Sequence, residues 1–335
     1  MRIFAAITAI AGLTLLTGLT AYYGFAAVLA AVLSSQWATA LVVVIRAAAL
    51  GMCGVGWWFL LTPISRGPGV FVGLRFVREG INTMFPFAGV GGDLIGARLL
   101  AQLGVVLNVA IASVLIDIFL QVACLLIVVL AGLGIVLNLV GVHQLTATTF
   151  VMLAIAFPAV GGFFLTLHFG RFEPVVRRLV AFGRKRQWAA FNQVADLGAR
   201  LQQIWRNRRG LSASFVIHLG AIVLGAAEVW VALAFMGYPV SPAGAIAIES
   251  IGQGSRAAVF VLPAGVGVQD GTLIAASALF GVPAEIALAM ALIKRVPDLV
   301  LGIPALLAWQ TLESRHLLAA RKIVPSPEDQ PTTPA

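Results

Sequence analysis

The sequence predicts an all-α polytopic membrane protein, built as an inverted-topology repeat of span, re-entrant hairpin and span. Three observations predict this class. Hydrophobic residues make up 60% of the 335 residues and charged residues only 10%, whereas a soluble domain is about half apolar and a quarter charged. Several apolar runs are long enough to cross a bilayer, and two further apolar regions are broken by proline and glycine.

The unbroken apolar runs predict six full spans, because a helix needs about 20 residues to cross a bilayer. They cover residues 3–22, 36–61, 106–130, 149–169, 211–235 and 283–307. The first run follows Met1-Arg2 and resembles a signal peptide. No small-residue cleavage site leads from it into a soluble domain, so we interpret it as an uncleaved span.

The two broken regions, residues 71–104 and 246–281, predict re-entrant helical hairpins. Their interruptions centre on Pro86 and Pro263, each followed by several glycines and an aspartate. Each half is about 11–16 residues long, which is short for a span and suits a hairpin that enters and leaves the membrane on one side.

The two halves of the chain are related by a shift of 177 residues, the distance from Pro86 to Pro263. The same shift places Asp93 on Asp270 and Gly104 on Gly281 without a gap. Chance matching of apolar residues is the alternative, but it does not account for the shared spacing of proline, aspartate and glycine. We therefore predict one transmembrane domain, residues 1–312, with repeats at about 36–131 and 213–308.

The distribution of Lys and Arg along the chain predicts its orientation in the membrane. Residues 171–210 carry ten Lys/Arg and two acids, which is eight of the net charge of +9. A basic loop beside spans is the positive-inside pattern and argues against nucleic-acid binding. Residues 62–80, with Arg66, Arg75 and Arg78, fall on the same side, whereas loops 23–35 and 138–148 have no Lys or Arg. The copies are then inverted and both termini are cytoplasmic in a bacterial inner membrane.

The basic segment 171–210 has apolar residues near helical spacing, so it fits an amphipathic helix on the inner leaflet. A solvated linker is the alternative. Residues 313–335 are predicted to form a cytoplasmic tail that is disordered from about residue 325, where prolines and polar residues dominate.

Ionisable residues inside spans are costly and are functional candidates. We expect the two hairpin tips to meet and form a polar groove for an anionic lipid headgroup, because helix N-termini carry free N–H groups and a partial positive charge. The expected substrate-binding residues are Asn82, Asp93, Arg98, Arg256, Gln269 and Asp270. The expected charge-coupling residues are Asp117, Glu249, Lys294, Arg295 and Asp298.

Two structural alternatives stay open for these residues. Asp93 and Asp270 could be helix N-caps, since aspartate is a favoured cap. Asp117 and its repeat equivalent Lys294 carry opposite charges, so Asp117 could form a salt bridge with Lys294 or Arg295. Asp117, Glu228 and Glu249 could also carry protons or be structural carboxylates.

The sequence lacks the motifs of several kinds of enzyme and metal site. The histidines His143, His168, His218 and His316 are scattered without metal-ligand spacing, and Cys53 and Cys124 lie in separate apolar runs. The chain has no GxSxG elbow and no ATP-binding loop. We expect no cofactor, no metal and no catalytic residue.

The motifs resemble a known bacterial family. The run REGINTMFP at 78–86 with Gly91-Gly92-Asp93, the pair Glu249-Ser250, the run PAGVGVQDG at 263–271 and the pair Lys294-Arg295 are its signatures. Over about residues 3–312 they are similar to the flippase-like transmembrane domain of lysylphosphatidylglycerol synthases and its stand-alone relatives, most of all to the hopanoid-biosynthesis branch. The family usually has glutamate at the position of Asp270, so the acid has a shorter reach here.

The resemblance implies that the chain binds and translocates a lipid, such as a hopanoid. No soluble domain follows Glu313, so lysyl transfer is not expected. Lipid-biosynthetic enzymes are possible partners. Two other functions stay open: an intramembrane lipid-modifying enzyme that uses Asp93 and Asp270 as acid and base, and a non-catalytic scaffold on which enzymes dock through residues 171–210.

Overall fold

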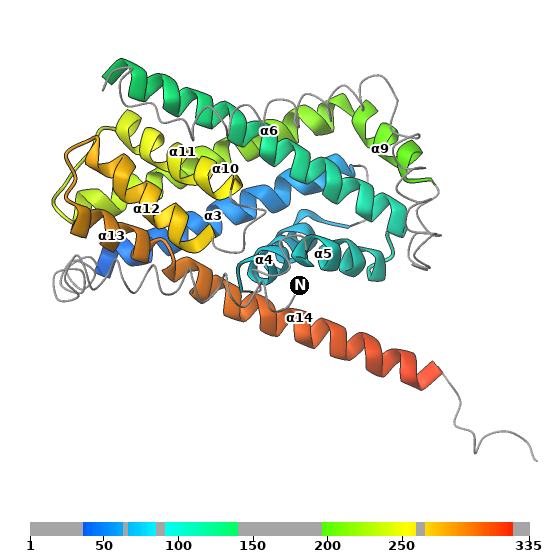
Figure 1. Ribbon diagram of the computed structural model, residues 1–335. Coiled ribbons are helices and arrows are strands. Elements are labelled where there is room, and N and C mark those ends of the chain that lie inside the picture. The colour runs from blue at the N-terminus through cyan, green and yellow to red at the C-terminus, as the bar shows by residue number, and fades with distance from the viewer. Residues whose placement is uncertain (1–35, 63–65, 85–90, 140–195, 259–264, 324–335) are drawn as a thin grey trace, which may run out of the picture.

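The computed structural model describes residues 36–62, 66–84, 91–139, 196–258 and 265–323, whose regular structure is entirely helical (Figure 1). The predicted spans 3–22 and 149–169, both hairpin tips, most of segment 171–210 and the tail from 324 lie outside the described residues. The helices are α3 (Gln36–Leu60), α4 (Pro68–Met84), α5 (Gly91–Gln102), α6 (Leu107–Leu139), α9 (Leu197–Arg206), α10 (Arg208–Phe235), α11 (Pro242–Ala258), α12 (Gly265–Ala278), α13 (Ala284–Ile293) and α14 (Val296–Ile323).

Three of the described helices, α3, α6 and α10, are long and apolar enough to cross a membrane. They correspond to the predicted spans 36–61, 106–130 and 211–235, although α6 is longer than expected, at 33 residues. In Figure 1, α6 runs along one edge of the bundle for most of its length. The full pattern of six spans and two re-entrant hairpins stays a prediction.

The prediction of one continuous span at 283–307 is wrong. The structure has two helices there, because α13 ends at Ile293 and α14 begins at Val296. Pro297 explains the break, since its ring clashes with the carbonyl four residues earlier and it disfavours helical backbone at the preceding residue. Helix α14 continues past residue 312 to Ile323, so the first part of the predicted tail segment 313–335 is helical.

The helix order α3, α4, α5, α6 recurs as α10, α11, α12 and the pair α13 and α14. The ends of α5 and α12 match in detail. Gly104 and Gly281, which are 177 residues apart, both adopt left-handed backbone with φ of 96° and 75°. In each case the next residue, Val105 or Val282, donates its N–H to a carbonyl five residues earlier. This hydrogen-bond pattern is a Schellman motif, which favours glycine at the left-handed position.

The repeat-related helices α3 and α10 pack antiparallel through the middle of the molecule. Arg46 contacts Glu228, and Gly56, ten residues later in α3, faces His218, ten residues earlier in α10. The pairing is centred near Ala48 and Gly225, which are themselves 177 residues apart. Two copies related by a two-fold axis between them require this arrangement.

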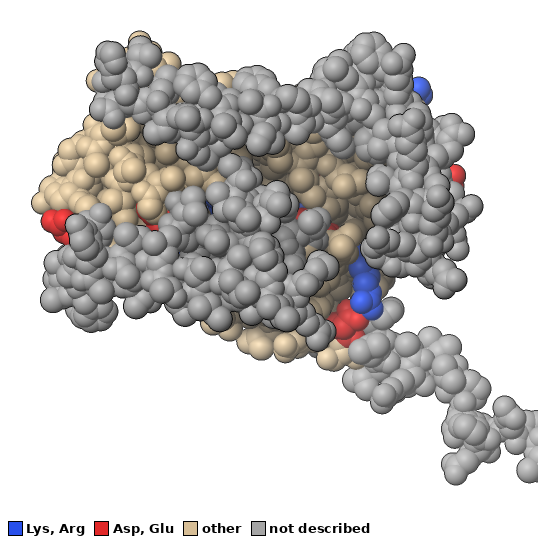
Figure 2. Space-filling view, in the orientation of Figure 1, with Lys and Arg blue, Asp and Glu red and all other residues tan. Residues whose placement is uncertain are grey.

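The outer surface of the described helices is largely apolar. Few charged side chains are visible among the described residues in Figure 2, and most of those lie at the edges of that face. Large hydrophobic side chains are exposed on α3, α6, α10 and α14, including Trp37, Ile127, Val216 and Leu307. Such a surface suits contact with lipid, where apolar side chains carry no desolvation penalty.

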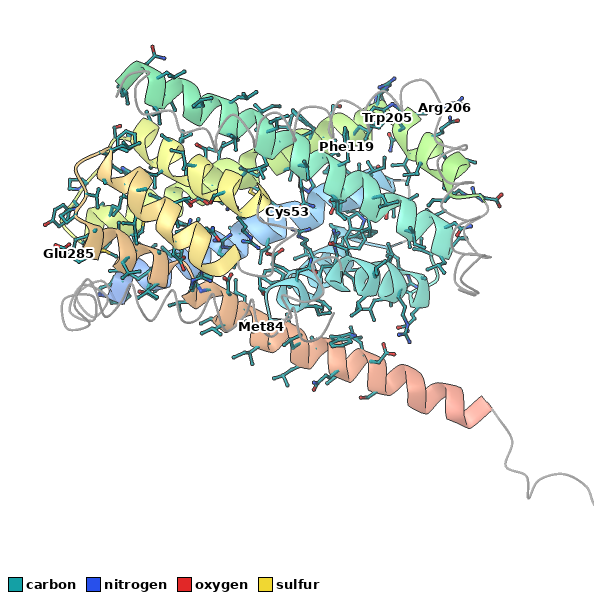
Figure 3. All side chains as sticks on the ribbon, viewed as in Figure 1. Cys53, Met84, Phe119, Trp205, Arg206 and Glu285 are labelled. Carbon is teal, nitrogen blue, oxygen red and sulfur yellow. The ribbon has the colours of Figure 1, made fainter. Side chains whose placement is uncertain are left out.

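The short helix α9 lies within segment 171–210. Its apolar side chains Leu197, Leu201, Ile204 and Trp205 are buried. The Trp205 ring packs edge-on against Phe119 of α6, with 5.9 Å between ring centroids (Figure 3). The apolar face of α9 therefore packs against the protein.

Candidate functional site

Arg78 of α4 is the centre of the first of two buried ion-pair networks. Its side chain is fully buried. Its Nε and Nη2 donate to Asp93 Oδ1 of α5 at 2.9 and 2.6 Å, and its Nη1 lies 2.8 Å from Asp117 Oδ2 of α6. The Trp57 ring lies 4.6 Å from the guanidinium carbon, which adds a cation–π contact. Arg78 thus joins three helices.

Asp93 is not the N-cap of its helix, which corrects that alternative. It is the third residue of α5, and its carboxylate is held by Arg78 and by Asn82 Nδ2 at 3.3 Å. The capping hydrogen bond comes from Asn82, whose Oδ1 accepts from the Gly92 N–H at 2.9 Å. Any side chain at Gly92 would collide with the Arg78 carbonyl, so glycine is required for this close approach of α5 to α4.

Asp117 connects this network to the second repeat. Its Oδ2 also lies 3.7 Å from Arg75 Nη1, and its Oδ1 lies 3.1 Å from His218 Nε2 of α10. The alternative in which Asp117 forms a salt bridge with Lys294 or Arg295 is wrong, because all three residues have other partners. Asp117 faces Arg75 and Arg78 of its own repeat. Its repeat equivalent, Lys294, lies in the other half of the molecule.

The second network surrounds Lys294, at the C-terminal end of α13. Lys294 Nζ donates to Glu249 Oε2 of α11 at 2.7 Å and to Glu228 Oε2 of α10 at 3.0 Å. Glu228 Oε2 also accepts from Arg46 Nη2 of α3 at 2.8 Å. Glu228 therefore links α3, α10 and the end of α13, and Lys294 adds α11 through Glu249.

A separate ion pair holds the second hairpin. Arg295 Nη2 donates to both carboxylate oxygens of Asp270 at 2.8 Å. Asp270 is the sixth residue of α12, so it is not an N-cap either. At the position equivalent to Arg78 the second repeat has Ser255, which contacts the Thr272 hydroxyl at 2.7 Å.

Glu79 and Arg256 meet where the two repeats face each other. The distance between Glu79 Oε1 and Arg256 Nη2 is 4.0 Å, and the Arg256 side chain is 44% exposed. These residues are 177 apart, so each is the repeat equivalent of the other. A residue can meet its own equivalent only near the axis that relates the two copies, so this axis passes between α4 and α11.

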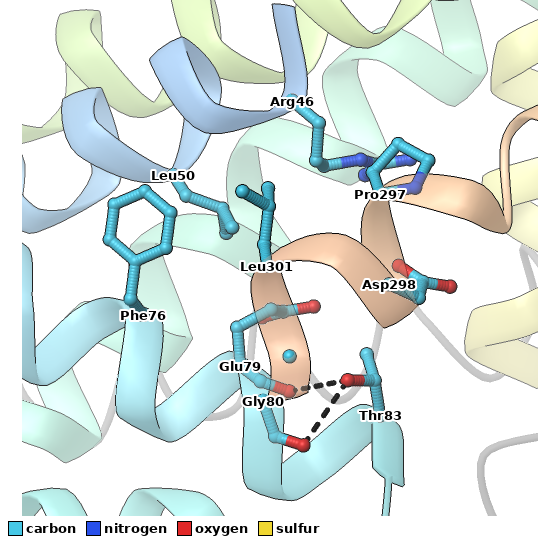
Figure 4. A pocket seen from close by; sticks show the side chains of 10 residues that line it. Arg46, Leu50, Phe76, Glu79, Gly80, Thr83, Pro297, Asp298 and Leu301 are labelled. Carbon is cyan, nitrogen blue, oxygen red and sulfur yellow. Dashed lines mark hydrogen bonds between the residues drawn. The ribbon is translucent and has the colours of Figure 1, made fainter. Parts of the chain in front are cut away.

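A pocket lies beside this axis between α3, α4 and α14 (Figure 4). The pocket is small and partly open: its enclosed space is about the size of one water molecule. Its lining residues are Arg46, Leu50, Phe76, Glu79, Gly80, Thr83, Pro297, Asp298, Leu301 and Gly302. The lining combines one cation and two carboxylates with an apolar wall, so it can contact a polar group and a hydrocarbon together.

The structure does not bring the predicted site residues into one groove. Asn82 and Asp93 belong to the first network, Glu249 and Lys294 to the second, and Asp298 to the pocket. Gln269 is half-buried in α12. Arg98 lies apart from all of them, because its side chain is 58% exposed and pairs with Glu313 of α14 at 2.7 Å.

The expected cradle of cations for an anionic headgroup is therefore much reduced. Lys294 and Arg295 are neutralised by buried carboxylates, and Arg98 is remote. Arg256 remains near the pocket, facing a carboxylate at 4.0 Å. The mixed lining favours a headgroup that both donates and accepts hydrogen bonds over a simple anion.

Arg75 and Arg78 were predicted to be cytoplasmic loop charges. That prediction is wrong, because both side chains are buried in α4. Of the three arginines in 62–80, only Arg66 is exposed. A signal for them did exist: Arg75, Arg78 and Glu79 have i, i+3, i+4 spacing within an apolar run, which places all three on one helix face.

Among the described residues, no group of three or more His, Cys, Asp or Glu side chains could hold a metal ion. Residues 3–305 match the protein family described as the lysylphosphatidylglycerol synthase TM region. No curated protein and no solved structure matches the chain. The matched range contains both networks, the pocket and the axis.

Proposed function

The chain belongs to the family of lysylphosphatidylglycerol synthase transmembrane regions, and on this premise we propose that it binds an amphipathic lipid and moves it between membrane leaflets. The family and the three long apolar helices make the chain a membrane protein related to lipids. The resemblance of its motifs extends the proposal to a hopanoid or a polar derivative of one. The distribution of Lys and Arg extends it to a bacterial inner membrane with both termini in the cytoplasm.

The pocket beside the repeat axis is the observation that carries the proposal. Arg46, Glu79 and Asp298 offer a headgroup charged partners, and Leu50, Phe76 and Leu301 offer an apolar wall for the adjoining hydrocarbon. The enclosed part of the pocket is about the size of one water molecule, so in this proposal the pocket widens to admit a headgroup, and the chains of the lipid remain in the bilayer.

The place of the pocket also supports movement. It lies between helices of both repeats, because α3 and α4 belong to the first copy and α14 to the second. A shift of one copy against the other would change its shape and its open side. Alternating access by one repeat rocking against the other is a recurring mechanism in inverted-repeat transporters.

We propose no catalytic step. Asp93 and Asp270, the two residues that an acid–base enzyme would need, are each held by an arginine. These contacts support a structural role for both carboxylates. Lipid-biosynthetic enzymes would act before or after translocation, as separate partners.

A leaflet assay in reconstituted liposomes tests the proposal. Fluorescent lipids with anionic, zwitterionic and polyol headgroups would be followed as they become accessible to a membrane-impermeant quencher. We expect Arg256→Ala/Asp298→Asn to slow movement of at least one lipid by about tenfold, which corresponds to about 1.4 kcal/mol in the barrier.

Arg98→Ala is the control, because Arg98 is a charged residue of α5 whose side chain pairs with Glu313 and lies away from the pocket. It should move lipid at the wild-type rate. Equal rates for wild type, the double variant and protein-free liposomes with every lipid would overturn the proposal.

A further inference from the structure

We infer that Asp298, in the pocket beside the repeat axis, is a proton-binding site whose carboxyl group takes up a proton from solution through the open side of the pocket. Asp298 is the third residue of α14, and it lines the pocket together with Glu79 and Thr83 of α4 (Figure 4). The contacts of its side chain and its apolar surroundings support this site, which does not depend on lipid movement.

Asp298 lacks the cation partner that comparable carboxylates have. Six other carboxylates lie in the two networks or at the axis, and each has an Arg or Lys nitrogen within 4.0 Å: Glu79, Asp93, Asp117, Glu228, Glu249 and Asp270. Among the described residues, no Arg or Lys nitrogen lies within that distance of Asp298. Its carboxyl group is therefore the one in the described pocket and networks whose negative charge would face no cation directly.

The groups around Asp298 already have other partners. The charged groups that act on it from the elements packed around it are Arg46 of α3, Glu79 of α4, Arg256 of α11 and Arg295 directly before α14. Each of the three arginines faces another carboxylate, at 2.8 Å for Arg46 and Arg295 and at 4.0 Å for Arg256. Thr83, the neutral side-chain donor of the described lining, donates its hydroxyl to the Glu79 carbonyl at 2.8 Å.

The position of Asp298 on α14 places it beside lipid. Leu299, Val300 and Ile303 expose large apolar side chains on the same part of the helix, and such a surface suits a membrane. An uncompensated charge is costly there, and a carboxyl group in these surroundings binds a proton instead of staying ionised. Because the pocket is partly open, the proton can exchange with solution.

The first repeat has a neutral side chain at the equivalent position. Gln121, which is 177 residues before Asp298, accepts from Arg75 Nη2 at 2.9 Å and donates to Asp117 Oδ2 at 2.9 Å. A protonated aspartate is neutral too, and it offers one O–H donor beside its acceptors. With the proton bound, the charges of Arg46 and Glu79 balance in the described lining, and Asp298 adds a donor for a headgroup.

Thermal unfolding in detergent tests the site with the neutral variant Asp298→Asn. A carboxyl group that is protonated in the folded state and ionised in the unfolded state makes the fold less stable as pH rises. The asparagine is neutral at every pH. From about pH 6 to about pH 9, the unfolding temperature of Asp298→Asn should therefore rise by several degrees relative to that of the wild type.

Asp270→Asn is the matched control, because it changes an aspartate that Arg295 holds in its ionised form. It should unfold below the wild type at each pH. An ionised Asp298, stabilised by the positive end of α14, would instead make Asp298→Asn resemble this control. A difference from the wild type that does not grow with pH, or that follows Asp270→Asn, would overturn the inference.

Infrared spectroscopy of the full chain detects the proton directly, because the C=O stretch of a protonated carboxyl group is separate from the bands of a carboxylate. At about pH 7 the wild type should show a protonated-carboxyl band that Asp298→Asn lacks and Asp270→Asn retains. Identical spectra for the wild type and Asp298→Asn would overturn the inference. Neither measurement involves lipid movement, so a failed leaflet assay would leave the proton site standing.

Discussion

The two repeats use the same helices but neutralise their charges differently. In the first copy one arginine, Arg78, binds the aspartates of both neighbouring helices. In the second copy Ser255 takes its place, Lys294 replaces the equivalent of Asp117, and Asp270 turns to Arg295. The comparison teaches that the backbone pattern of a duplicated unit can persist while each copy acquires its own set of ion pairs.

The helix break in the second copy makes this difference possible. Asp117 lies within the continuous helix α6, whereas Lys294 and Arg295 lie between α13 and α14. Adjacent residues on a continuous helix point about 100° apart. At the break, Lys294 reaches α10 and α11 while Arg295 reaches α12. In the second copy, the junction between α13 and α14 therefore supplies two cations that face different helices, where the first copy uses Arg78 alone.

The largest expected effect comes from removing the arginine that only the first copy has. Arg78→Leu leaves Asp93 and Asp117 without their main partner, and removing one side of a buried pair costs about 3–5 kcal/mol. Ser255→Ala, the equivalent change in the second copy, removes a neutral hydrogen bond and should cost about 1 kcal/mol. Denaturant unfolding in detergent measures both. Similar costs at the two positions would contradict the comparison.

The second-largest loss of stability is expected on removing Lys294. Lys294→Met leaves Glu228 and Glu249 with Arg46 as their nearest remaining cation, and we expect a loss of about 3 kcal/mol. Adding Glu249→Gln removes the excess negative charge, so the double variant should be more stable than Lys294→Met alone.

The same unfolding measurement gives the coupling between these two changes in a double-mutant cycle. Additive losses would show that the Lys294–Glu249 contact contributes no coupling energy. Gln253→Ala is a suitable control, because it removes a neutral partner of Glu249 and leaves the charge unchanged.

The equivalent aspartates should differ by a smaller amount. Asp93→Asn weakens contacts with a fully buried arginine, whereas Asp270→Asn weakens contacts with Arg295, whose side chain is 27% exposed. Hydrogen bonds to charged groups contribute about 1.5–3 kcal/mol, and we expect Asp93→Asn near the upper end and Asp270→Asn near the lower end. A larger loss for Asp270→Asn in thermal unfolding would reverse this ranking.

The smallest effects are expected at exposed ion pairs. Arg256→Gln and Arg98→Gln should each change stability by less than about 1 kcal/mol, because solvent screens both pairs. Their functional effects should differ, since Arg256 lies at the axis and Arg98 does not. Of these two variants, only Arg256→Gln should slow lipid movement in liposomes. Equal rates for Arg256→Gln and Arg98→Gln would show that the residues at the repeat axis are not part of the proposed site.

Much of the fold follows from local features that the sequence displays. Apolar length marks α3, α6 and α10, and glycine at 104 and 281 marks the matched helix ends because only left-handed backbone needs it there. The break before Pro297 was missed because apolar residues on both sides hid it.

The pairing of charges could not be predicted in the same way. Asp117, Lys294 and Arg295 were identified as candidates, but their partners depend on which helix faces lie together. Arg78 and Asp93 are 15 residues apart, whereas Arg46 and Glu228 are 182 apart. Neither separation follows from a local pattern, so the contacts emerge only from the packed helices.

The meeting of Glu79 with Arg256 bears on how such a chain could have arisen. A symmetric dimer of single copies would place the same side chain on both sides of its axis, so an acid would face an acid or a base would face a base. Joining the copies in one polypeptide removes that restriction, because each side can then mutate alone. The attraction of opposite charges at the centre is thus available to the fused chain and denied to a homodimeric ancestor.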